Sequence, residues 1–216
     1  MELQKNKVFV QIGTNNGNDE FNKFVRQYNP SKVILIEPNS KLNQQIELNY
    51  NGIEVLIENY AITDTTKKEK VKIVKPKNIY NGRAKNGFYY SDAGYSLIPM
   101  DDWGDELDEL EVPSISLNDL MKKHNVINIH YLQIDTEGYD SEIIKSIDFT
   151  TLNIDILKYE NWIFSEDSFK RHGDDKKLYG INGMDNAEKL LKDLGYILTT
   201  DNIDTVATKI VKNEQI

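Results

Sequence analysis

One stretch decides the fold: VFVQIGTNNGND, which runs from Val8 to Asp19. It begins with an apolar run, turns between Gly13 and Gly17, and continues into apolar residues at helical spacing, at positions 21, 24, 25 and 28. This pattern predicts a strand, a glycine turn and a helix. Such a turn leaves free backbone N–H groups at the positive end of a helix, at the carboxyl edge of a sheet. Because α/β folds bind ligands at that edge, we expect a ligand site here.

The spacing of the glycines indicates a nucleoside ligand rather than a dinucleotide. In a dinucleotide-binding turn a second glycine follows the first by two residues, and a third packs the helix onto the strand. Asn15 and Asn18 occupy those positions. The next apolar strand, KVILIEP, ends in Glu37, an acid placed to accept hydrogen bonds from both hydroxyls of a ribose.

Carboxylates also follow two later strands. IHYLQI leads into Asp135, and IDILKYENW carries Glu160. Because the carboxyl ends of parallel strands meet at one edge, we expect both acids to lie in the row of Gly13 and Glu37. Asp140 has a simpler interpretation, since it stands where the N-terminal cap of the following helix is expected.

Four short motifs, GTNNG, IEP, AITD and LQIDTEGYD, stand in this order along the chain. In order and spacing they resemble the FkbM family of S-adenosylmethionine-dependent methyltransferases, over roughly Val8 to Ile210. The resemblance implies S-adenosyl-L-methionine as the cofactor and a Rossmann-like class I methyltransferase fold with strand order 3-2-1-4-5-7-6. It also implies O-methylation, commonly of sugars or natural products.

The resemblance also implies which residues bind the cofactor. The turn from Gly13 to Gly17 would hold its methionine part, Glu37 its ribose and residues 59–61 its adenine side, while Asp135 and Glu137 would lie at the reaction centre. The expected cofactor contacts are Gln11, Gly13, Thr14, Asn15, Asn16, Gly17, Glu37, Asn59, Tyr60, Ala61, Asp135 and Glu137.

A neutral hydroxyl acceptor would need a general base as well as an activated methyl group. Asp135, Glu160 and His172 are the candidates. A free histidine has a pKa of about 6.5 and accepts a proton near neutral pH. The alternative for His172 is an ordinary surface histidine in a loop.

The order of the predicted elements indicates an α/β fold. Strands alternate with helices until the last two strands, YILTT and VATKIV, whose short connection cannot make a parallel crossover. We expect a doubly wound, mostly parallel sheet of seven strands, with the last strand antiparallel. A chain of 216 residues, 39% of them hydrophobic, suits a single domain over residues 1–216.

Two irregular segments interrupt the pattern, at about 76–113 and 164–184. Long connections inside a compact domain are usually functional or disordered, and connections at strand ends pass over the ligand edge. We therefore expect both segments to act as lids and to form the acceptor pocket. The expected acceptor contacts are Tyr89, Tyr95, Ser96 and Trp103. Alternatively these aromatic side chains only pack the loops onto the body. The acidic residues between 101 and 111 are interpreted as a solvated face.

Composition excludes some classes of function. A balance of 26 basic against 35 acidic residues gives a net charge of −9, which works against attraction to nucleic acid phosphates or anionic membranes. The chain has no cysteine, and its three histidines show no metal-ligand spacing, so no metal site is expected. No apolar run is long enough to span a bilayer and no signal peptide is evident. We expect a cytoplasmic protein that acts on a small molecule such as a carbohydrate.

Two other classes stay open. An NAD-dependent or nucleotide-sugar oxidoreductase would use a similar turn and acid, although the second and third glycines are missing and no Tyr-x-x-x-Lys pair is present. A nucleoside-binding module without catalysis would keep the fold alone. Binding of NADH would favour the first alternative, and donor binding without turnover would favour the second.

Overall fold

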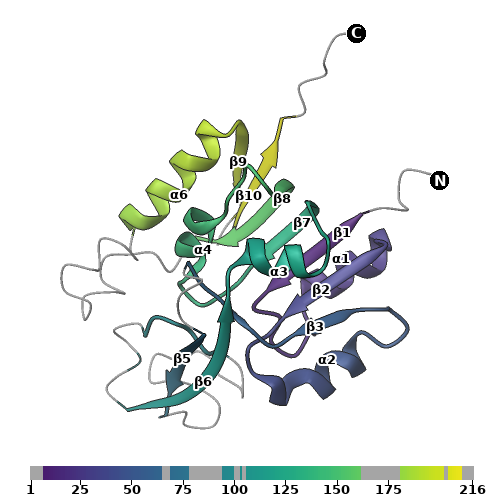
Figure 1. Cartoon of the computed structure of the whole chain (residues 1–216), viewed down its shortest axis with the longest axis vertical. Helices are drawn as coiled ribbons and strands as arrows, with labels where there is room; N and C mark the ends of the chain where they lie inside the picture. Colours follow the sequence, from purple (N-terminus) through teal and green to yellow (C-terminus); the bar gives the residue numbers. More distant parts are fainter. Residues whose placement is uncertain are drawn as a thin grey trace.

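The computed structural model describes residues 7–64, 69–77, 94–99, 103, 106–161, 181–201 and 204–210. Within these residues the chain forms a seven-stranded sheet and a smaller three-stranded sheet (Figure 1). The strands of the large sheet are β1 (Val8–Ile12), β2 (Lys32–Ile36), β3 (Leu56–Glu58), β7 (Asn128–Ile134), β8 (Asn153–Glu160), β9 (Tyr196–Asp201) and β10 (Asp204–Lys209).

The large sheet has the order β3-β2-β1-β7-β8-β10-β9. The strands from β3 to β8 pair in parallel, whereas β10 runs antiparallel to both β8 and β9. Counted along the chain within this sheet, the order is 3-2-1-4-5-7-6. The predicted seven-stranded, mostly parallel sheet with a reversed last strand is therefore confirmed.

Helices cover both faces of the large sheet. On one face α1 and α2 pack over Phe9, Val33 and Leu35, and on the other α3, α4 and α6 pack over the side chains that alternate with them, Val10 and Ile34 among these. The helices are α1 (Glu20–Tyr28), α2 (Asn43–Asn49) with the preceding 3-10 turn η1 (Ser40–Leu42), α3 (Leu117–Lys123), α4 (Asp140–Ser146) and α6 (Ile181–Asp193). This alternation of buried side chains is what a parallel sheet with helices on both faces requires.

The position of α1 depends on an N-terminal cap. The Asp19 side chain accepts a hydrogen bond from the backbone N–H of Asn22 at 2.9 Å, which satisfies one of the free donors of the first turn. The other oxygen of Asp19 accepts a bond from the Gln11 amide at 2.6 Å. One carboxylate therefore joins the start of α1 to strand β1, which fixes both ends of the glycine turn.

The small sheet lies at one end of the large one and has the order β4-β6-β5 (Figure 1). Its strands are β4 (Ala61–Ile62), β5 (Lys70–Pro76) and β6 (Leu107–Ile115). The prediction of irregular structure up to residue 113 was therefore wrong for the part that forms β6. Lys70 pairs with Glu111 at 2.9 Å and Lys72 with Glu109 at 2.7 Å, so these two acids lie on a solvated face, opposite lysines on the neighbouring strand.

No helix among the described residues is long and apolar enough to cross a membrane.

Candidate functional site

The site begins where three parallel strands end side by side. The carbonyl oxygen of Ile36, the last residue of β2, accepts bonds from the N–H groups of Gly13 at 2.9 Å and Thr14 at 3.2 Å. The carbonyl oxygen of Ile12, the last residue of β1, accepts one from Asp135 at 3.0 Å. These main-chain bonds hold the loops after β1, β2 and β7 together. The predicted convergence of Gly13, Glu37 and Asp135 at one edge is thus what the backbone shows.

Gly13 is the point of closest approach between two of these loops. Its φ of +82° lies in the left-handed region that favours glycine. A Cβ atom at this position would lie 1.7 Å from the carbonyl oxygen of Asp135, which is far inside van der Waals contact. A glycine is required here because both the turn and the crossing of the β7 loop leave no room for a side chain.

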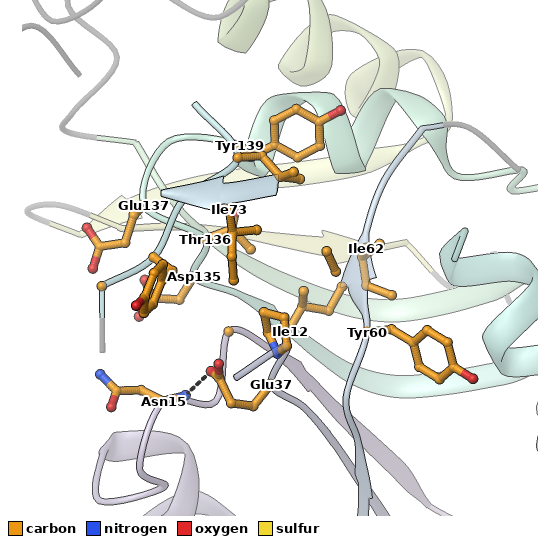
Figure 2. A pocket seen from close by; sticks show the side chains of 16 residues that line it. Ile12, Asn15, Glu37, Tyr60, Ile62, Ile73, Asp135, Thr136, Glu137 and Tyr139 are labelled. Atoms are coloured by element: carbon orange, nitrogen blue, oxygen red, sulfur yellow. Dashed lines mark hydrogen bonds between the residues drawn. The ribbon is translucent and has the colours of Figure 1, made fainter. Parts of the chain in front are cut away.

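A cavity opens above this edge, with an empty volume of about 680 Å³, part of it open to solvent. One wall comes from the large sheet and its loops, and the other from the small sheet with Ile62 and Ile73 (Figure 2). The segment around Tyr95 also lines the cavity. The lining residues are Ile12, Gly13, Asn15, Glu37, Pro38, Tyr60, Ala61, Ile62, Ile73, Gly94, Tyr95, Leu97, Asp135, Thr136, Glu137 and Tyr139.

Glu37 is a buried carboxylate with a fixed orientation. Its side chain is only 7% exposed and accepts hydrogen bonds from the backbone N–H groups of Asn15 at 2.8 Å and Asn39 at 2.9 Å. Burial raises the pKa of Glu37 from 4.5 to about 7, against the lowering effect of these two bonds. Each carboxylate oxygen keeps a free lone pair, so Glu37 can still accept two hydrogen bonds from a ligand in the cavity.

Asp135 and Glu137 place two more carboxylates along the cavity wall, on the loop between β7 and α4 (Figure 2). Burial and the neighbouring carboxylates, Glu137 first among them, raise the pKa of Asp135 well above its usual range. Asp135 itself is exposed to the cavity, so water there screens part of this effect. Burial, with a smaller effect of Asp140, raises the pKa of Glu137 to about 7. The wall therefore favours a cationic ligand, which would stabilise the ionised carboxylates.

A family model described as the methyltransferase FkbM domain matches residues 11–198. The chain belongs to the FkbM methyltransferase family. A search of curated proteins gave no match. The family match spans the glycine turn, the three strand ends and all of the cavity lining, so it covers the whole of the site described above.

The cofactor contacts predicted for this FkbM methyltransferase fall into two groups. Those that line the cavity are Gly13, Asn15, Glu37, Tyr60, Ala61, Asp135 and Glu137. Those that do not are Gln11, Thr14, Asn16, Gly17 and Asn59. Two residues of the second group, Gln11 and Asn59, hold the main chain or side chains next to the cavity lining in place. The Gln11 amide holds Asp19, and the Asn59 amide donates to the carbonyl oxygen of Glu37 at 2.7 Å.

Tyr60 borders the cavity, but its ring extends away from Glu37 and Asp135 (Figure 2). The ring packs partly against the hydrophobic core, and the ammonium group of Lys123 lies 5.2 Å from its centroid. A cation at this distance from a tyrosine ring is attracted to it. In this structure the Tyr60 ring is therefore engaged by the core and by Lys123 rather than directed at the carboxylates of the cavity.

Asp140 was interpreted from the sequence as the cap of the following helix, and this was wrong. Asp140 is the first residue of α4, after Tyr139. Its buried carboxylate accepts bonds from the Thr136 hydroxyl at 2.7 Å and from the backbone N–H of Glu160 at 3.3 Å. Asp140 therefore ties the loop after β7 to the end of β8. Burial raises its pKa, while these bonds lower it.

The three candidate bases do not share one position. Asp135 lines the cavity, whereas Glu160 lines a neighbouring hollow that Asp135 also borders, together with Asp19, Lys158 and others. His172 lies outside the described residues, as does most of the second lid segment, 164–184. Of the three, Asp135 is the carboxylate that the structure brings to the cavity itself.

The acceptor contacts predicted from the sequence have different outcomes. Tyr95 lines the cavity, together with Gly94 and Leu97, so part of the first irregular segment does reach the carboxyl edge. Ser96 is 2% exposed, its oxygen accepts a bond from the backbone N–H of Ile98, and it does not line the cavity. Trp103 is 3% exposed in the main core. The structure therefore does not support Ser96 and Trp103 as acceptor contacts, and Tyr89 lies outside the described residues.

Several residues line the cavity without having been predicted from the sequence, among them Ile73 on β5, Leu97 and Tyr139. Tyr139 could have been predicted, because it belongs to the LQIDTEGYD motif. Ile73 and Leu97 could not, because their place at the cavity follows from the pairing of β5 with β6 and with the segment of Ser96.

Proposed function

We propose that this FkbM methyltransferase uses S-adenosyl-L-methionine and methylates a hydroxyl group of a sugar or another small polyhydroxylated acceptor. The main observation behind the proposal is the position of Glu37. Its carboxylate is buried and oriented, lies at the end of the strand next to the glycine turn, and lines the cavity. Its free lone pairs match the two hydroxyls of a ribose, and charge-assisted hydrogen bonds of this kind are strong.

The rest of the cavity fits the remainder of such a donor. Gly13 lines the cavity together with Glu37 and Asp135, so a 5′ substituent on a ribose at Glu37 can extend along this edge towards the loop after β7. There it meets Asp135 and Glu137, whose carboxylates would be neutralised by a sulfonium. A dinucleotide such as NAD carries a diphosphate next to its ribose, and the diphosphate would add charge repulsion at the same wall.

Bound S-adenosylmethionine supplies a methyl group that the sulfonium has already activated, so alignment and exclusion of water are the main tasks of the protein. In this proposal, Asp135 at the cavity would accept the proton that an acceptor hydroxyl loses while its oxygen bonds to the methyl carbon and the carbon–sulfur bond breaks. A raised pKa makes Asp135 a better proton acceptor near neutral pH than an ordinary carboxylate. Glu160 and His172 stay as alternative bases.

The second wall supports a ring-shaped, hydroxylated acceptor. Tyr95 offers an aromatic face at the cavity, and aromatic faces pack well against the apolar side of sugar rings. We propose that the irregular segments about 76–106 and 164–184 complete this acceptor side as lids, consistent with Gly94, Tyr95 and Leu97 at the cavity.

Calorimetry with S-adenosylmethionine, S-adenosylhomocysteine and NAD tests the proposal. We expect the two sulfur nucleosides to bind with dissociation constants of about micromolar order, as is usual for enzyme substrates, and NAD not to bind. Tighter binding of NAD would overturn the methyltransferase proposal in favour of an oxidoreductase. A panel of glycosides and nucleotide sugars with labelled donor then tests the acceptor. Donor binding without transfer to any hydroxyl compound would favour a module without catalysis.

A further inference from the structure

The loop that carries Glu137 holds this residue in an unusual backbone conformation. Glu137 has a φ of +54° and Gly138 a φ of +105°, both in the left-handed region. Glycine adopts this region easily, whereas a glutamate there raises the free energy of the folded state. The consequence of the conformation is that the Glu137 side chain lines the cavity close to Asp135. Strain of this kind at a cavity wall points to a role for the side chain in the ligand site.

The charges around Glu137 are unbalanced. The described residues that line the cavity include the carboxylates of Glu37, Asp135 and Glu137 but no lysine, arginine or histidine. Each oxygen of Glu37 already accepts one backbone N–H, and Asp140 behind the wall accepts bonds from Thr136 and from the N–H of Glu160. The Glu137 carboxylate makes no hydrogen bond or ion pair with the described residues. This carboxylate therefore remains available to a cation in the cavity.

Two described lysines beside the cavity and the neighbouring hollow are engaged with other groups. The ammonium group of Lys75 lies 4.9 Å from the centroid of the Tyr95 ring, on the small-sheet side. In the neighbouring hollow, the ammonium group of Lys158 lies 2.7 Å from the Asp204 carboxylate and 4.0 Å from that of Glu20. Two further acids, Asp19 and Glu160, face Asp135 from that hollow. Counted over the residues that the structure describes, the net charge beside Glu137 is therefore negative.

We propose that Glu137, acting with Asp135, is a specificity-determining residue that makes the cavity prefer the sulfonium donor over its neutral thioether product. The inference rests on the proposed function, because it requires that the donor binds with its ribose at Glu37. Donor and product differ by one methyl group and one positive charge at sulfur. Methyl transfer removes that charge from beside the two carboxylates, which weakens the binding of the product and promotes its release.

The preference depends on pH in a defined direction. Burial gives Glu137 a pKa of about 7, so a large share of its carboxyl groups is neutral at pH 6 and ionised at pH 8.5. A cationic donor gains attraction as the carboxyl ionises, whereas the neutral sulfur of the product gains none. The ratio of product to donor dissociation constants should therefore rise with pH, and donor binding near pH 7 should release more protons than product binding. The size of the extra methyl group cannot produce such a pH dependence.

Calorimetry on the full chain at pH 6, 7 and 8.5, in two buffers of different ionisation enthalpy, measures both quantities. For the wild type we expect the ratio to rise about three- to tenfold across this range, in keeping with a charge pair that water in the partly open cavity screens strongly. Glu137→Gln should weaken donor binding about tenfold and product binding less than twofold, and it should flatten the pH profile. Glu54→Gln is the matched control, since this exposed glutamate precedes β3 at the opposite edge of the sheet, and it should behave as the wild type.

The possible outcomes distinguish a failure of the inference from a failure of the proposed function. If both ligands bind but the ratio is independent of pH, or if Glu137→Gln weakens both equally, the inference is wrong and the proposed function stands. If neither ligand binds the wild type, the proposed function fails and the inference fails with it. Proton release on ligand binding is measured on the wild type alone. The test therefore holds even if Glu137→Gln does not fold. Asp135→Asn supplies a second variant with the same expected direction.

Discussion

The two walls of the cavity are built in different ways. The wall from the large sheet consists of loops that directly follow β1, β2 and β7, and main-chain hydrogen bonds at Gly13, Thr14 and Asp135 hold them together. The wall from the small sheet presents side chains, Ile73 and Tyr95 among them, from a sheet whose outer surface carries exposed ion pairs. A wall made of main chain tolerates few changes in sequence. A wall made of side chains can change with each substitution.

Under the proposed function, the two walls would have different tasks. The main-chain wall and the buried Glu37 would bind the donor. The side-chain wall would contact the acceptor, and substitutions there could reshape it without loss of the fold. The predictions below test whether the two walls behave independently, in order of decreasing expected effect.

Gly13→Ala should be the most damaging change. The new Cβ would lie 1.7 Å from the carbonyl oxygen of Asp135, and the residue would keep a φ of +82°. We expect a loss of about 3–5 kcal/mol in the free energy of unfolding and no donor binding, because the clash has only backbone to displace. Urea denaturation measures the loss. Gly52→Ala is the control, since Gly52 has the same φ but nothing within 4 Å, and it should lose only about 1–2 kcal/mol. Equal losses in both variants would show that the crossing at Gly13 can relax.

The ligand-free protein should lose stability as the pH rises. The pKa of Glu37 is about 7 in the folded state against an ordinary value of 4.5, so the folded state binds the proton more tightly than the unfolded state. This contribution is fully present below pH 4.5 and is lost as the pH rises through 7, by at most about 3 kcal/mol. Glu137 acts in the same direction. Thermal unfolding from pH 5 to pH 8 should show the decline, and Glu37→Gln should make it shallower. An identical slope in the variant would contradict the assignment to Glu37.

The main-chain wall could be predicted from the sequence because each of its residues follows directly from a local pattern. Gly13, Glu37 and Asp135 each stand just after an apolar run, and parallel strands bring such positions to one edge. Asp140 was misread because its partner, the N–H of Glu160, is supplied by the neighbouring strand. From the sequence alone, an aspartate that caps a helix cannot be distinguished from one that links two neighbouring strands.

The side-chain wall was less predictable because it depends on pairings between distant residues. Strand β6 was hidden in an acidic run, although Leu110 and Val112 alternate there with Glu109 and Glu111. The matching lysines at 70 and 72 were the signal that could have revealed its partner. Trp103 shows the complementary error, since an aromatic residue in an irregular segment can belong to the core as easily as to a pocket.

Glu37→Ala should weaken donor binding by about 1–3 kcal/mol, because it removes charge-assisted hydrogen bonds to the two ribose hydroxyls. The change also leaves the N–H groups of Asn15 and Asn39 without their acceptor, so Glu37→Gln, which retains one oxygen, is the companion variant. Calorimetry with S-adenosylmethionine gives the comparison. Donor affinity equal to that of the wild type in Glu37→Ala would remove the ribose assignment.

Tyr95→Ala should act on the acceptor side alone. Loss of the aromatic face should lower kcat/KM for the acceptor about tenfold, and the donor dissociation constant should stay as in the wild type. Tyr95→Phe keeps the ring and should retain most of the activity. The competing interpretation is that Tyr95 only packs against the small sheet, where it adjoins Ile73 and Val112. In that case the melting temperature of Tyr95→Ala would fall before its kinetics changed.

Lys72→Ala should have the smallest effect, and the reason separates the two walls most cleanly. The Lys72 side chain is 64% exposed and its partner Glu109 is 55% exposed, so water and salt screen the pair on both sides. The lysine also lies on the outer surface of the small sheet. The main-chain bonds at Gly13, Thr14 and Asp135, which build the main-chain wall, do not involve it. We expect a melting temperature within error of the wild type and an unchanged donor dissociation constant, at low and at high salt. A clear loss of donor affinity in Lys72→Ala would mean that the small sheet and the glycine turn are coupled. The effect of a change on the exposed face of β5 would then reach Glu37 through the cavity that both walls share.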